Sequence, residues 1–169
     1  RERRDMQDYV MELSRSMPEA PRHAPPAAPE TRPRTLMAVE MRRYARPRGV
    51  LEPLDTLARM GRDLRRVAAA VGARGGRLEI AAGHRILASF DGDGRSLRAL
   101  QSAAEVLAVL SSRDLELEQA EPPLLALAAG DALSGSVTYA DEPERVLLGP
   151  AVQQLEVLMR EATPKDLVL

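Results

Sequence analysis

The chain has 169 residues, of which 44% are hydrophobic and 29% charged, and its formal net charge is −1. This composition excludes a strongly basic nucleic-acid-binding protein and an acidic disordered tail. The absence of cysteine excludes disulfides, zinc–thiolate sites and a thiolate nucleophile. No apolar stretch approaches the ~20 residues of a membrane span, and no signal-peptide pattern opens the chain. We therefore expect a cytoplasmic setting, with neither nucleic acid nor membrane as a partner of this segment.

The first 34 residues differ in composition from the rest of the chain. Residues 1–17 space their apolar side chains three and four apart, which predicts an N-terminal amphipathic helix. Residues 18–34 include six prolines, which disfavour helix and strand alike, so this segment is predicted to be a linker. Residues 35–169 have a normal size for one domain. Because the chain begins with arginine rather than methionine, we expect it to be part of a longer protein.

In chain order, the spacing of apolar residues predicts alternating strands and helices in the order β-α-β-β-α-β-β-α-β. The predicted strands lie at 36–41, 77–81, 85–90, 124–129, 134–139 and 167–169, and the predicted helices lie at 52–72, after Ser96 and after Gly149. This order is typical of an α+β fold with a ferredoxin-like antiparallel sheet and helices packed on it.

Two of these elements carry more specific expectations. The helix after Ser96 is predicted to bury one stripe of its surface, made of Leu97, Leu100, Ala104, Leu107 and Leu110. The strands at 124–129 and 134–139 are predicted to pair with each other across a turn at Gly130-Asp131.

Four segments of the predicted domain match family motifs in the same order along the chain. Ala38–Tyr44 is similar to F-A-D-I-x-G-F, and Gly75–Phe90 is similar to G-G followed by the hairpin K-x-x-G-D-x-x-x-A-x-F. Leu125–Gly135 is similar to I-G-I-H-T-G-x-x-x-x-G, and Val146–Gln153 to x-x-x-G-D-x-V-N. Together they resemble the catalytic domain of class III adenylate and guanylate cyclases, which implies that family's fold for residues 35–169.

The resemblance also implies that the family's chemistry is lost. The two metal-binding aspartates of the family fall on Glu40 and His84, and imidazole is a poor magnesium ligand. The two base-reading positions fall on Ile80 and Val146, whose side chains cannot hydrogen-bond a purine. The ribose-orienting asparagine falls on Gln153, and the phosphate-stabilising arginine falls on Val157. We expect these positions to be unused relics, with no catalytic residue, no metal and no cofactor.

Two relic positions leave alternatives open. Glu40 either still holds a metal or lies at the rim of the domain paired with an arginine, since an unpaired buried carboxylate is costly. His84 is either a metal or acid–base group, or a structural residue of a hairpin turn.

The charges are segregated along the chain. Residues 35–90 hold 11 basic and 5 acidic side chains, whereas residues 91–169 hold 6 basic and 14 acidic ones. A dense basic cluster follows the first strand and comprises Arg42, Arg43, Arg46 and Arg48. It is a solvated surface, an anion or acidic-partner site, or a face that meets the acidic loops of a second copy.

These observations predict a non-catalytic cyclase-like domain that regulates or dimerises a larger bacterial-type signalling protein, which can itself be membrane-anchored. Its expected partner is a second copy or another protein domain. A nucleotide- or anion-binding sensory module that uses the former cleft is the alternative, and a divergent active cyclase using Glu40 and His84 is the third possibility.

Overall fold

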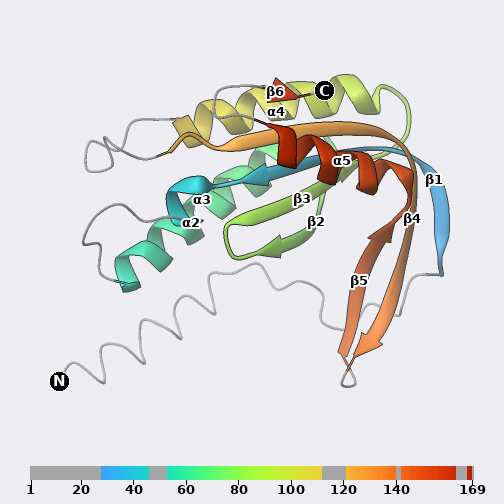
Figure 1. Ribbon diagram of the computed structural model, residues 1–169, viewed down its shortest axis with the longest axis horizontal. Helices are drawn as coiled ribbons and strands as arrows, with labels where there is room; N and C mark the ends of the chain where they lie inside the picture. The colour runs from blue at the N-terminus through green and yellow to red at the C-terminus, as the bar shows by residue number, and fades with distance from the viewer. Residues whose placement is uncertain (1–27, 46–52, 112–120, 140–141, 163–166, 169) are drawn as a thin grey trace.

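The structure is a computed structural model that describes residues 28–45, 53–111, 121–139, 142–162 and 167–168 (Figure 1). The predicted helix at 1–17, most of the predicted linker, and two residues of the basic cluster, Arg46 and Arg48, lie outside these ranges. None of the helices within them is long and apolar enough to span a membrane.

A curled sheet forms the centre of the molecule. Its strands are β1 (Glu30–Glu40), β2 (Arg77–Ala82), β3 (Arg85–Phe90), β4 (Leu124–Tyr139), β5 (Glu142–Leu148) and β6 (Leu167–Val168). Five strands pair antiparallel in the order β2-β3-β1-β4-β5, and β6 runs parallel beside the start of β4. The helices are α2 (Arg42–Ala45), α3 (Pro53–Ala73), α4 (Arg95–Ser111) and α5 (Pro150–Glu161). The predicted α+β class with an antiparallel sheet is confirmed.

The helices cover the two faces of the sheet unequally (Figure 1). Alternate residues of β1 point to opposite faces, so Met37 and Val39 join the core beneath α3 and α4, while Leu36 joins a smaller core beneath α5. Only α5 packs on this second face, against β4 and β1. The part of that face formed by β3 and β2 is therefore left more open.

The predicted linker boundary at residue 34 is wrong, because β1 begins at Glu30. Residues 30–34 pair with Ser134–Gly130 of β4, whereas pairing with β3 starts only at Thr35. This stretch thus has one neighbouring strand, and a proline such as Pro33 is tolerated in a strand with an open edge.

The predicted turn at Gly130-Asp131 is also wrong, since β4 runs without interruption from Leu124 to Tyr139 and pairs with β5 instead. Gly130 does not adopt the left-handed conformation that such a turn favours. A Cβ added there would lie 3.6 Å from the Cβ of Ala151 on α5. The glycine therefore serves close packing of a helix on a strand.

The predicted buried stripe of α4 is mostly wrong. Leu97 is 61% exposed, and the residues buried on this helix are Ala99, Ser102, Ala103, Val106 and Leu110. Small side chains face the sheet and α3, where the Ser102 hydroxyl donates to the carbonyl of Ala70 at 3.4 Å. Small side chains allow close approach to the neighbouring elements, while Leu97 and Leu100 lie outside the core and Leu110 is buried as predicted.

The curl of the sheet brings its two edge strands together. β4 pairs with β1 from Leu124 to Ser134 and with β5 from Leu133 to Tyr139, so β5 is carried away from β1 (Figure 1). β2 and β5 lie at opposite ends of the strand order, yet their Cα atoms come within 8 Å of each other. The second face of the sheet is consequently concave.

Candidate functional site

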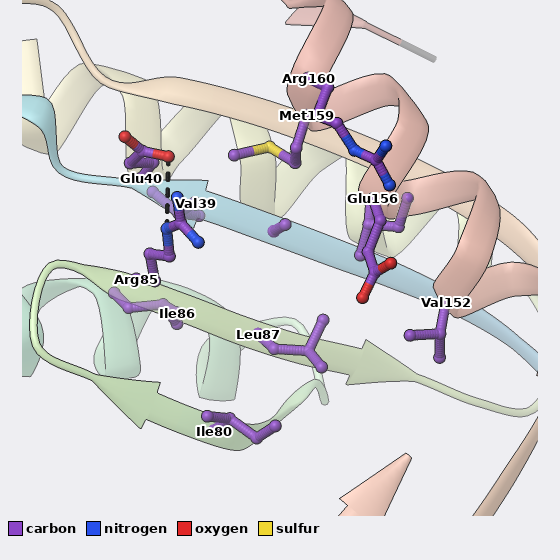
Figure 2. Close-up of a pocket in the computed structure, with 12 residues that line it drawn as sticks. Val39, Glu40, Ile80, Arg85, Ile86, Leu87, Val152, Glu156, Met159 and Arg160 are labelled. Atoms are coloured by element: carbon purple, nitrogen blue, oxygen red, sulfur yellow. Dashed lines mark ion pairs between the residues drawn. The ribbon is translucent and has the colours of Figure 1, made fainter. Parts of the chain in front are cut away.

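A groove of about 360 Å³ lies on the concave face between α5 and the β2–β3 hairpin. Ala38 lines it from β1. Leu87 and Ile80 line it from the hairpin, and Val152 and Met159 face them from α5 (Figure 2). Charged side chains stand at its rim: Glu40, Arg85, Glu156 and Arg160. Its volume falls within the range of small-molecule pockets, which combine apolar walls with a few polar groups.

The two relic metal positions, Glu40 and His84, lie next to each other at one end of this groove. His84 follows Gly83 in the turn between β2 and β3, and its carbonyl accepts a hydrogen bond from the Met41 amide at 2.8 Å. Its Nε2 lies 4.0 Å from Glu40 Oε1, and Arg85 Nε lies 3.5 Å from Glu40 Oε2 (Figure 2). We call these three residues the Glu40 cluster; the sequence predicted its two relic positions but not Arg85.

The Glu40 cluster does not fit the pair of divalent metals that the family resemblance implies. A magnesium site needs several oxygen ligands, and this cluster offers one carboxylate, one imidazole and one guanidinium. Within the described ranges, no group of three or more histidine, cysteine, aspartate or glutamate side chains is arranged to hold a metal ion. The arginine provides the positive charge that neutralises Glu40.

The remaining relic positions are divided between the groove and the outer surface. Ile80 lines the groove and is 42% exposed. Val146 lies on β5, half-buried, while Gln153 and Val157 are exposed on α5 and lie outside the groove lining. The structure thus brings Glu40 and Ile80 to one groove, with His84 beside Glu40 but outside the groove lining, and places Gln153 and Val157 elsewhere.

The described half of the basic cluster is already paired with carboxylates. Arg42 Nε lies 3.4 Å from Glu121, and Arg43 Nη1 lies 3.7 Å from Asp63 of α3. The Tyr44 hydroxyl donates to the same Asp63 at 2.7 Å. Burial and then this hydrogen bond raise the pKa of the Tyr44 phenol. Asp63 therefore fixes α2 against α3, and Arg43 is engaged in that contact.

A second cluster on the concave face, centred on Glu79, was not predicted. Glu79 and Arg34 have side chains only 1% exposed, and they lie 3.5 Å apart. The other partners of Glu79 are Ser89, which donates to Oε1, Arg77 at 3.5 Å, and Arg145 at 2.8 Å. The only sequence signal was a charged residue inside a predicted strand. We call this set, together with Ser134, the Glu79 cluster.

Searches of family models and of curated proteins give no match to the chain. Solved structures do match. The guanylyl cyclase Cya2 is 18% identical with a TM-score of 0.64, over 80% of this chain and 73% of that one. The adenylyl cyclase CyaB from P. aeruginosa is 13% identical with a TM-score of 0.68, over 81% and 76%. A dimeric guanylyl cyclase domain from the fungus Blastocladiella emersonii is 13% identical with a TM-score of 0.67, over 80% and 77%.

These three structures share the arrangement of sheet and helices with this chain at low sequence identity. The predicted class III cyclase-like fold is therefore confirmed. Identities of 13–18% establish the fold alone, so the activity has to be inferred from the side chains of this chain.

Proposed function

We propose that this chain is a non-catalytic domain of the nucleotide cyclase fold that serves as a regulatory or dimerisation module in a larger signalling protein. The observation that carries the proposal is the Glu40 cluster, in which Arg85 and His84 flank a carboxylate that the sequence resemblance aligns with a metal-binding position of the family. A guanidinium and a divalent cation compete for the same carboxylate, since each neutralises its charge.

The groove supports the same proposal. Its lining includes Ala38, Leu87 and Ile80, which offer no side-chain donor or acceptor to the edge of a purine. At its rim, Glu40 and Glu156 would repel the phosphates of a nucleotide, while Arg85, which is paired with Glu40, and Arg160 would attract them. The resemblance assigns a metal-binding carboxylate and two base-reading side chains of active cyclases to positions where this chain has His84, Ile80 and Val146.

A dimerisation role is supported by an apolar patch on the β4–β5 ribbon. In the strand register, Leu148 lies opposite Leu133 and Val146 lies opposite Gly135, so these side chains and Val137 share one face. Leu148 is 57% exposed and Val137 is 54% exposed. Exposed apolar side chains gathered on one face mark interaction surfaces. The fungal domain of the same fold has been solved both as a non-canonical dimer and as a monomer. A second copy of this chain is the occupant we propose.

The catalytic part of the proposal is tested by incubating the purified chain with ATP or GTP and Mg²⁺ or Mn²⁺ and measuring cyclic nucleotides. We expect no product above the protein-free blank. Product that disappears in Glu40→Gln would overturn the proposal and establish the divergent cyclase. Calorimetry with the same nucleotides distinguishes the sensory alternative, because saturable binding without turnover, lost in Arg85→Ala, would support a ligand-binding module instead.

The dimerisation part is tested by sedimentation velocity over a range of concentrations. We expect Leu148→Arg to weaken self-association at least tenfold. Leu97→Arg is the matched control, because Leu97 is similarly exposed but lies on α4, outside the β4–β5 ribbon. A wild-type chain that remains monomeric at all concentrations, or equal effects of the two variants, would contradict the proposed surface.

A further inference from the structure

The Glu79 cluster joins all five antiparallel strands of the sheet. Its residues come from β1 (Arg34), β2 (Arg77 and Glu79), β3 (Ser89), β4 (Ser134) and β5 (Arg145). Arg34 links the two halves of the sheet, because its Nη1 faces Glu79 while its Nη2 donates to the Ser134 hydroxyl at 2.8 Å. A single carboxylate thus organises contacts that reach every strand.

The contact between Glu79 and Arg145 spans the sheet from edge to edge. β2 and β5 are the two ends of the strand order, with β3, β1 and β4 between them. In a flat sheet, four spacings of 4.7–4.9 Å would put these edges about 19 Å apart. The observed 2.8 Å between Arg145 Nε and Glu79 Oε2 therefore requires the curl of the sheet.

A β-bulge gives Glu79 its orientation. Leu78 is paired with Ala88 and Ile80 with Leu87, so Glu79 is an extra residue on β2. In a regular strand, Glu79 and Ile80 would point to opposite faces. Here both point to the concave face, Glu79 toward Ser89 and Ile80 into the groove. Bulges commonly re-aim side chains in this way.

We propose that the Glu79 cluster is an electrostatic lock between the two edges of the sheet, which fixes its curl and thereby the width of the groove. The lock is buried where it meets Arg34 and more open where it meets Arg145, whose side chain is 33% exposed. Its release at Arg145 frees the β4–β5 ribbon from β2. Because Ile80 directly follows Glu79, the hairpin wall of the groove moves with it.

The proposal is tested by measuring the distance between β2 and β5 in solution. The chain contains no cysteine, so Ala82→Cys and Glu144→Cys place spin labels at two exposed sites without further changes. Double electron–electron resonance measures the distance between the two labels. This distance is compared among the labelled parent and the same protein carrying Arg145→Gln or Glu105→Gln. The last variant is a matched control, because it removes an exposed carboxylate that pairs with Arg74 on the helical face.

We expect a narrow distance distribution in the parent and in Glu105→Gln, and a broader one shifted outward by about 5 Å, one strand spacing, in Arg145→Gln. Arg145→Gln keeps the buried Arg34–Glu79 pair, so the fold is expected to persist. Hydrogen exchange serves as a second readout, with at least tenfold faster exchange in β2 and β5 and unchanged exchange at the centre of β1. An unchanged distance distribution in folded Arg145→Gln would overturn the lock.

Discussion

Two carboxylates on the same concave face, Glu79 and Glu40, each face basic side chains but lie in different surroundings. Glu79 is 1% exposed and contacts arginines from three strands. Glu40 is 16% exposed, and its partner Arg85 is 71% exposed and belongs to the adjacent strand. The same type of ion pair therefore occurs once inside the curl of the sheet and once at the open rim of the groove.

The difference between these clusters lies in solvation. Water screens and competes with the Glu40 pair, whereas the Glu79–Arg34 pair has lost its water and depends on its protein partners. A buried charge left alone is costly, but an exposed one is not. Glu79 is thus committed to the architecture, and Glu40 can change its partners without affecting the fold.

The largest expected effect comes from neutralising each carboxylate in turn. Glu79→Gln leaves Arg34 buried without a counter-charge and is expected to lower the free energy of unfolding by about 3–5 kcal/mol. Glu40→Gln is expected to lower it by less than about 1 kcal/mol. Urea unfolding followed by circular dichroism measures both. Similar losses for the two variants would contradict the contrast in solvation.

The Glu40 cluster is also expected to bind a metal ion once the guanidinium of Arg85 is removed. The double variant His84→Asp and Arg85→Ser places a second carboxylate beside Glu40 and deletes the guanidinium. We expect its Mn²⁺ affinity to be at least tenfold higher than that of the wild type, about 1.4 kcal/mol. Calorimetry measures this gain, and Glu40→Gln in the same background is expected to remove it. Equal Mn²⁺ affinities of the double variant and the wild type would contradict the idea that the Arg85 guanidinium takes the place of a metal ion beside Glu40.

Salt gives a smaller effect that again distinguishes the two clusters. Raising the ionic strength from 0.1 M to 1 M shortens the screening length from about 10 Å to about 3 Å. The difference in the free energy of unfolding between wild type and Glu40→Gln is therefore expected to vanish at 1 M NaCl. The corresponding difference between wild type and Glu79→Gln is expected to persist. Unfolding in urea with added NaCl tests this, and an equal salt dependence of the two differences would count against it.

The same two clusters show what the sequence could predict. Glu40 and His84 were singled out as candidate site residues because they lie in two family-like motifs that occur in the expected order. In the structure, their side chains are 4.0 Å apart. The element order and both helices of at least 17 residues were also predictable, because long periodic segments carry a strong signal. Glu79 escaped prediction because a β-bulge changes the face to which it points, and Arg145 lies far away in the sequence.

Long-range packing explains the other errors. The break predicted at Gly130 rested on the turn preference of glycine, but its role is the approach of Ala151. The stripe predicted on α4 followed hydrophobicity, but the first half of the buried face is formed by small side chains such as Ala99 and Ala103. Neither constraint is visible until the partner element is placed. The apolar patch on β4 and β5, which we propose as a dimer surface, escaped notice for the same reason, since β5 was not predicted as a strand.

A third carboxylate, Asp63, is also buried, but its hydrogen-bond partner is the phenol of Tyr44, which can lose its proton at high pH. Asp63 is 7% exposed and accepts the hydrogen bond of Tyr44. Because burial and this bond raise the pKa of Tyr44 above its ordinary value of about 10, the folded state keeps the proton where the unfolded state releases it. The stabilisation is fully present below pH 10 and is lost as the pH rises further. Wild-type stability is therefore expected to fall between pH 10 and 11.5.

Tyr44→Phe isolates this contribution, since the other two tyrosines of the chain are present in both proteins. The variant is expected to be about 0.5–1.5 kcal/mol less stable than the wild type at pH 8, because Asp63 loses a hydrogen bond. Its stability is expected to fall less steeply above pH 10, so the two urea-unfolding curves of stability against pH converge. Parallel curves would mean that Tyr44 titrates normally, and that Asp63 resembles the solvated Glu40 more than the buried Glu79.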